Sequence, residues 1–193
     1  MISNNNRTCF AAANTTSGFI SYFGQVFDPE KVGRIYIIKG GPGTGKSGLM
    51  RRISREAEKR ELSVEKILCS SDPSSLDGVL IPSLDLAVLD GTAPHTADPV
   101  YPGAVESIVN TGAFWDRKEL LKRKEEILSL TGQGKRCYRR AYRFLEGAGA
   151  VAREMQRSAS AALLKNKMEK QIDRLKKMAE DIKANLFENG EMQ

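Results

Sequence analysis

Residues 34–61 contain the pattern that most limits the possible fold, because a hydrophobic strand, a glycine-rich loop and an amphipathic helix follow one another directly. The run Arg34–Lys39 (RIYIIK) is rich in β-branched and aromatic residues, which is typical of a central parallel strand buried on both faces. A helix is expected from Lys46 to about Glu61, because apolar residues recur at helical spacing at Leu49, Met50, Ile53 and Ala57. This succession favours an α/β fold.

The loop between them matches the pattern GxxxxGK[ST] in the structural context that the pattern requires: Gly40, Gly41, Pro42, Gly43, Thr44, Gly45, Lys46 and Ser47, followed by Gly48. Glycines are needed because the backbone N–H groups must turn toward phosphates in conformations that a Cβ would obstruct. The following helix directs its N-terminal partial positive charge at the same anion. We therefore expect residues 40–48 to bind a nucleoside triphosphate, with Lys46 at the β- and γ-phosphates and Ser47 on Mg²⁺.

Two further strands are expected at residues 63–69 and 84–90, separated by a turn-rich loop over residues 70–78. The second ends in LAVLD, and an acid at this place, Asp90, is typical of a carboxylate that holds Mg²⁺ through water. An ordinary buried strand before a turn aspartate gives the same pattern. Gly91 follows, so the glutamate that activates water in many ATPases does not occupy its usual position. Either the base lies elsewhere, or hydrolysis is slow, or the acceptor is not water.

Polar residues in the loops after these strands are candidates for that role, because ligands of open α/β sheets bind at the carboxyl ends of the strands. His95, the single histidine, is the candidate catalytic residue beside Lys46, although a lone histidine is more often structural. The remaining candidates are carboxylates: Asp72, Asp77, Asp98 and Glu106. Asp72 could orient a second substrate, but capping a turn before Pro73 is its more ordinary role.

The C-terminal part is expected to be almost continuous helix, with a break near Thr131 to Gly134. Its end carries a heptad-like seam of Met168, Ile172, Leu175, Ala179, Ile182 and Leu186. We therefore expect a P-loop NTPase core with a small, mostly parallel sheet and an appended helical hairpin or coiled-coil-like arm. The expected bounds are residues 1–115 for the nucleotide-binding domain, 116–187 for the arm and 188–193 for a frayed tail. A short strand near Cys9 and a short helix near Phe23 are expected before the core.

Charge and cysteine content limit the partners and the compartment. The net charge is +6, and residues 117–183 hold 19 Lys and Arg against 9 Asp and Glu, so the basic character belongs to the helices. The three cysteines are far apart and without CxxC spacing, which predicts neither a disulfide framework nor a zinc site. No secretory signal pattern and no apolar run of about 18 residues is present, so a soluble, cytoplasmic protein without a membrane partner is expected.

Several segments resemble the N-terminal half of a group of bacterial P-loop ATPase-like proteins: NTTSGFISYF, IIKGGPGTGKSGLM, CSSDPSSLDGVLIP, LDGTAPHTADPVYPGAVE and FWD. The resemblance covers roughly residues 8–150, and its most specific element is DGTAPH at residues 90–95. Proteins of that group look like tandem duplications, in which a second P-loop half follows the helical segment. The resemblance implies ATP binding and supports the roles of the loop, Asp90 and His95. It also makes a second P-loop half, or a second copy of the chain, an expected partner.

Three functions are compatible with these residues. The first is an ATP-binding protein with slow Mg²⁺-dependent ATPase activity, in which nucleotide state alters the helical arm or a partner interface. An arginine finger could come from the arm, from Arg136, Arg139, Arg140 or Arg143, although arginines on a helix usually form a solvated face. The second is a small-molecule or nucleotide kinase, which needs a partly apolar cleft beside the γ-phosphate. The third, not favoured, is a nucleic-acid-associated module that uses the basic helices.

Overall fold

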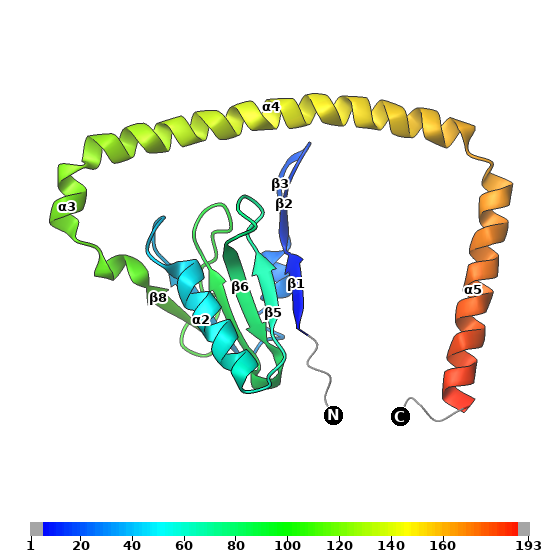
Figure 1. Ribbon diagram of the computed structural model, residues 1–193, viewed down its shortest axis with the longest axis horizontal. Helices are drawn as coiled ribbons and strands as arrows, with labels where there is room; N and C mark the ends of the chain where they lie inside the picture. Colours follow the sequence, from blue (N-terminus) through cyan, green and yellow to red (C-terminus); the bar gives the residue numbers. More distant parts are fainter. Residues whose placement is uncertain (1–5, 189–193) are drawn as a thin grey trace. The chain divides into compact units, whose positions relative to one another are not determined.

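The computed structural model describes residues 6–188, with side chains through residue 184. The chain divides into two compact units, residues 1–146 and 147–193. The first unit is an α/β domain built on a six-stranded sheet, and the second consists of long helix (Figure 1). Within the described residues, no helix is both long and apolar enough to cross a membrane.

The sheet of the first unit has the strand order β1-β5-β6-β7-β4-β8. Its strands are β1 (Arg7–Phe10), β4 (Arg34–Lys39), β5 (Glu65–Leu68), β6 (Leu76–Ile81), β7 (Leu86–Asp90) and β8 (Glu106–Asn110). All neighbours pair in parallel except β6, which is antiparallel to β5 and β7. The predicted α/β class and mostly parallel sheet are confirmed.

Two strands of this sheet, β6 and β8, were not expected from the sequence. The prediction of a loop over residues 70–78 is wrong at its end, because Leu76 already begins β6. The turn residues before Leu76 form only the connection from β5 to β6. The 3₁₀ turn η1 (Pro82–Leu84) then joins β6 to β7, and the two strands pair. β8 lies at the sheet edge with alternately exposed residues, so it lacks the continuous apolar run of a central strand.

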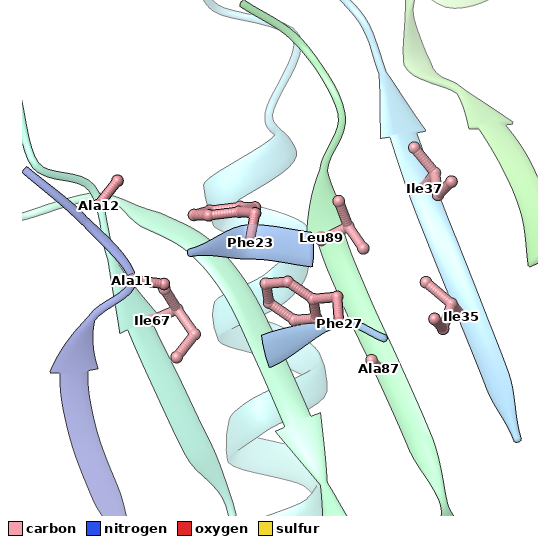
Figure 2. Close-up of a cluster of buried hydrophobic side chains, with 9 residues drawn as sticks. All are labelled: Ala11, Ala12, Phe23, Phe27, Ile35, Ile37, Ile67, Ala87 and Leu89. Atoms are coloured by element: carbon pink, nitrogen blue, oxygen red, sulfur yellow. The ribbon is translucent and has the colours of Figure 1, made fainter. Parts of the chain in front are cut away.

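Alternation along the strands produces a core on each face of the sheet. On one face, Ile37 of β4 and Leu89 of β7 belong to a cluster with Phe23 and Phe27, which Figure 2 shows. Phe23 begins the short helix α1 (Phe23–Val26), which follows the hairpin of β2 (Ala12–Thr15) and β3 (Gly18–Ser21). On the other face, helix α2 (Lys46–Lys59) buries its apolar stripe against the sheet (Figure 1). Both cores hold the carboxyl ends of β4 and β7 in fixed register.

The C-terminal helices differ from the prediction in where they break. After the 3₁₀ turn η2 (Thr111–Phe114) come α3 (Arg117–Lys122), α4 (Lys124–Ala162) and α5 (Lys165–Glu188). The predicted break near Thr131 to Gly134 is wrong, because α4 is continuous there. A glycine costs a helix only about 1 kcal/mol relative to alanine, which does not end it. The chain leaves the helix at Leu163 and Leu164 instead.

The long C-terminal helix is thus confirmed, and its coiled-coil-like pairing stays a prediction. Five apolar members of the predicted seam are exposed on α5: Met168, Ile172, Leu175, Ala179 and Ile182. The side chain of Leu186 and the predicted frayed tail beyond residue 188 lie outside the described residues.

Candidate functional site

The loop from Gly40 to Ser47 joins β4 to α2, as the sequence predicted, and two of its glycines have left-handed backbone conformations. Gly43 and Gly45 both have φ of 81°, a region that residues with a Cβ rarely adopt. Gly45 is the N-cap of α2 and no side chain caps the helix there, so the first N–H groups of α2 have no side-chain acceptor at that position. The loop thus presents backbone donors at a helix N-terminus, which is the arrangement that favours an anion.

The other two glycines are required by close neighbours from the segment after β8. A Cβ on Gly40 would lie 2.2 Å from Oγ1 of Thr111, and a Cβ on Gly41 would lie 2.2 Å from Cη2 of Trp115. Thr111 also donates from its hydroxyl to the carbonyl oxygen of Lys39, at 3.1 Å. Residues 111–115 therefore pack directly against the beginning of the loop.

The ammonium group of Lys46 lies at the centre of the site. Its Nζ donates to the carbonyl oxygens of Gly40 and Gly41, at 2.8 and 3.0 Å, and lies 3.5 Å from Oδ2 of Asp90. The other carboxylate oxygen of Asp90 accepts from the backbone N–H and the hydroxyl of Thr92, at 2.9 and 2.5 Å. The structure thus brings together two residues that the sequence singled out separately.

Ser47 lies next to them at the start of α2. Its Oγ accepts from the backbone N–H of Leu76 at 2.9 Å and from the guanidinium of Arg51 at 2.7 Å. The first bond ties the helix to the beginning of β6, and the second occupies the remaining lone pair of the hydroxyl. In the loop itself, Thr44 closes a turn by donating to the carbonyl oxygen of Gly41, at 2.8 Å.

A cleft of about 480 Å³ opens over the loop. We call it the loop cleft, and its walls include Gly41, Pro42, Lys46, Asp90, Asp77 and His95. Tyr138 also lines the loop cleft. This residue belongs to the part of α4 that lies in the first unit. Among the described residues, no group of three or more His, Cys, Asp or Glu side chains is placed to hold a metal ion. A metal here would depend on oxygen ligands from the hydroxyl, the carboxylate, water and a bound phosphate.

His95 is buried and held from several sides. Its Nε2 lies 3.0 Å from Oδ2 of Asp77, a buried residue of β6, and its Nδ1 lies 3.5 Å from Oγ of Ser21. The ring stacks on Phe23 with 4.0 Å between the ring centroids, and Phe19 packs against it at 4.9 Å. These contacts favour a structural role for His95, which lines the loop cleft while its polar atoms are engaged.

Cys69 completes this wall of the loop cleft, and it is not an activated thiol. Burial raises the pKa of the Cys69 thiol, and the adjacent Asp77 carboxylate raises it further by disfavouring a second negative charge. Backbone hydrogen bonds from Ser71 and Asp72 act in the opposite direction but do not outweigh the burial. A nucleophilic cysteine needs a lowered pKa, so nucleophilic catalysis by Cys69 is not supported.

The remaining candidate carboxylates stabilise local structure outside the loop cleft. Asp72 accepts from the backbone N–H and hydroxyl of Ser74, at 3.0 and 2.6 Å, and these bonds lower its pKa. Asp98 forms an exposed ion pair with Lys39, at 2.8 Å. Glu106 is buried at the start of β8, where its carboxylate accepts from the backbone N–H groups of residues 100 and 101.

Sequence reasoning missed two contributors to the site, Thr92 and Tyr138, and assigned a third, Asp77, to a loop. Thr92 had a readable signal, because a threonine two residues after an aspartate commonly donates back to its carboxylate. Asp77 was expected in a loop, but it lies on β6, a strand that the sequence did not predict. Tyr138 carried no signal, since its spacing on α4 also fits an ordinary helix face.

Comparison of the chain with protein-family models, curated proteins and solved structures finds no match.

Proposed function

We propose that the chain binds ATP with Mg²⁺ in the loop cleft and hydrolyses it slowly. One observation carries the proposal: Lys46, Asp90 and the glycine loop at the N-terminus of α2 line the same cleft. An ammonium, a carboxylate and a row of backbone donors at one place are the groups that bind a metal–triphosphate complex. The same loop favours any nucleoside triphosphate, and ATP is proposed on the resemblance of residues 8–150 to ATPase-like proteins.

The residues present fit such a ligand. The ammonium of Lys46 now bonds to two carbonyl oxygens of its own loop, and a phosphate oxygen would give it a stronger, charge-assisted bond. Mg²⁺ would take the hydroxyl of Ser47 and, through water, the carboxylate of Asp90. Since Arg51 occupies one lone pair of Ser47, its guanidinium would have to release the hydroxyl when the ion binds.

Slow hydrolysis follows because the two carboxylates among the described residues of the loop cleft, Asp77 and Asp90, are both engaged. Gly91 stands where many ATPases have a glutamate, and the acid deeper in the cleft, Asp77, is paired with His95. The site would therefore bind and position ATP well but would activate the attacking water poorly. Because Tyr138 lines the loop cleft, a bound nucleotide would contact α4 directly, which would couple nucleotide state to the helical arm.

The proposal is tested by titrating the full chain with ATP in a calorimeter, with and without Mg²⁺, and by following phosphate release. We expect Mg²⁺-dependent binding and turnover below the roughly 1 s⁻¹ lower end of typical enzymes. A parallel titration with GTP settles the base preference. Absence of binding by either nucleotide at millimolar concentration would contradict the proposal.

A kinase remains the second candidate, and a specific observation favours it. An apolar cavity adjoins the loop cleft and shares part of its wall. A partly apolar compartment next to the γ-phosphate is what a phosphoryl acceptor requires.

A further inference from the structure

A second cavity of about 600 Å³ opens beside the loop cleft. We call it the side chamber. Four residues line both spaces: Ser71, Ala93, Pro94 and Tyr138. Ala93 and Pro94 follow closely on Asp90, the residue expected near the metal and the γ-phosphate. The side chamber therefore adjoins the loop cleft at the end where the terminal phosphate of a bound triphosphate would lie.

The walls of the side chamber combine aromatic rings with positive charge. Phe19 of β3 and two tyrosines of α4, Tyr138 and Tyr142, supply the rings, while Lys135 and Arg139 supply the charge. Among the residues that the structure describes, no acidic residue lines the side chamber. Rings of this kind stack on planar heteroaromatic molecules, and arginine binds phosphate in a bidentate manner. The complementary ligand is a planar aromatic molecule that carries an anionic group.

One hydrogen bond holds the two sides of the side chamber together. The hydroxyl of Tyr142 donates to Oδ1 of Asn14 at 2.6 Å, which joins α4 to the hairpin of β2 and β3. The amide of Asn14 in turn donates to the carbonyl oxygen of Ser70 at 3.3 Å. The side chamber is thus bounded by hydrogen-bonded elements of the first unit.

We propose that the side chamber holds a nucleoside monophosphate, which accepts the γ-phosphoryl group of ATP. The base would lie against the aromatic walls, and Lys135 and Arg139 would bind the phosphate. This proposal rests on ATP binding in the loop cleft, and it names the acceptor of that site. In the transfer, an oxygen of the monophosphate bonds to the γ-phosphorus. The bond from that phosphorus to the β,γ-bridging oxygen breaks, its electron pair leaves with ADP, and the second product is a nucleoside diphosphate.

This acceptor accounts for the lack of a base beside Asp90. A phosphate monoester has a second pKa of about 6, so at neutral pH its oxygens are mostly deprotonated and no proton has to be removed before attack. An alcohol acceptor or water would need a base in the position that Gly91 occupies, and Asp77 is paired with His95. A phosphate acceptor requires positive charge at its own site instead, and Lys135 and Arg139 supply it.

The test titrates AMP, GMP, CMP and UMP separately into the full chain saturated with a non-hydrolysable ATP analogue. Inorganic phosphate is titrated as a control for binding by charge alone. We expect at least one monophosphate to bind, and Arg139→Ala to weaken it by about tenfold or more. The matched control is Arg153→Ala on the same helix, outside the walls of both cavities, which should leave the affinity unchanged. With ATP in place of the analogue, the same monophosphate should yield the diphosphate.

Several outcomes separate this proposal from the proposed function. If the ATP analogue binds and none of the four monophosphates does, the acceptor proposal fails while ATP binding stands. It also fails if Arg139→Ala and Arg153→Ala have equal effects, or if inorganic phosphate binds as tightly as the monophosphates. A further titration uses wild type and Lys46→Ala, both free of ATP and its analogue. If wild type binds the monophosphate and Lys46→Ala does not, the monophosphate lies in the loop cleft and the proposal is overturned.

Discussion

Nζ of Lys46 lies 3.5 Å from Oδ2 of Asp90, with side-chain exposures of only 12% and 16%. Such sheltered charges are screened much less by salt than surface pairs are. The lysine is therefore held toward the carboxylate that is expected to position the metal. A triphosphate entering the loop cleft would find both groups already close to their expected positions.

Replacing Lys46 by alanine should abolish tight ATP binding while leaving the fold intact. The fold should persist because, among the described residues, the ammonium bonds to two carbonyl oxygens of its own loop and pairs with Asp90. ATP binding should weaken because a charged hydrogen bond to phosphate contributes about 1.5–3 kcal/mol. The expected loss of affinity is roughly 10- to 150-fold, measured by calorimetry. Lys59→Ala is the control, because that exposed lysine lies outside the walls of the loop cleft and pairs with Glu56 one turn away. Unchanged affinity in Lys46→Ala would remove the basis for the site assignment.

Asp90→Asn should weaken ATP binding more in the presence of Mg²⁺ than in its absence. The substitution keeps an oxygen to accept from Thr92 but removes the negative charge that faces Lys46 and the expected metal position. Dissociation constants measured with Mg²⁺ and with a chelator give the comparison. Equal losses under the two conditions would show that Asp90 acts only in the structure of the loop.

The sequence predicted the parts of this site that depend on local pattern. The loop from Gly40 to Ser47 and the strand end at Asp90 are short motifs whose residue types follow directly from backbone geometry and charge. The loop and Asp90 also lie next to each other in space, because β4 and β7 are parallel and their carboxyl ends meet at one edge of the sheet.

The rest depended on long-range pairing that local pattern does not encode. β6 begins immediately after a turn-rich stretch, and its strand character comes from pairing with β5 and β7 on both sides. The contact of Trp115 with Gly41 joins segments about 70 residues apart. The burial of His95 between Asp77 and Phe23 likewise required three separate elements to be placed first.

His95→Ala should reduce stability far more than catalysis. The substitution removes the ring stacked on Phe23 and leaves the buried carboxylate of Asp77 without its partner. Loss of a partner from a buried hydrogen bond costs about 1–3 kcal/mol, and the lost ring packing adds to this loss, which chemical denaturation would measure. Asp98→Ala is the control, since its exposed pair with Lys39 should contribute less than about 1 kcal/mol. A fully stable His95→Ala variant with no ATP turnover would instead establish a catalytic role.

The fluorescence of Trp115 should report nucleotide binding. It is the single tryptophan of the chain, and its ring packs where a Cβ on Gly41 would lie. We expect ATP to change the emission of the wild type and to leave that of Lys46→Ala unchanged. Gly41→Ala should shift the emission without nucleotide, because the added methyl group displaces the ring. Gly24→Ala should not, because among the described residues no heavy atom beyond its chain neighbours and its own helix backbone lies within 4 Å of the added Cβ. A constant emission on ATP saturation would contradict the expected contact between the loop and its ligand.

The last prediction is that the chain self-associates, most simply as a two-fold dimer. The sequence predicted only three clear strands, and so small a sheet would need cover from a second copy, but the sheet has six strands. The apolar seam of α5 remains, because Met168, Ile172, Leu175 and Ile182 are exposed at spacings of four, three and seven residues. Such a stripe is the pattern by which helices pair.

Light scattering at about tens of micromolar, with and without ATP, measures the assembly. Leu175→Lys places a charge in the seam and should shift the population to monomer, because an unpaired charge is not tolerated in a packed helix interface. Lys177→Gln is the control, since that residue lies about 200° further around the helix. A wild-type chain that scatters as a monomer under both conditions would refute the prediction. A dimer unaffected by Leu175→Lys would move the interface away from α5, to a sheet edge such as β1, whose four residues are all exposed.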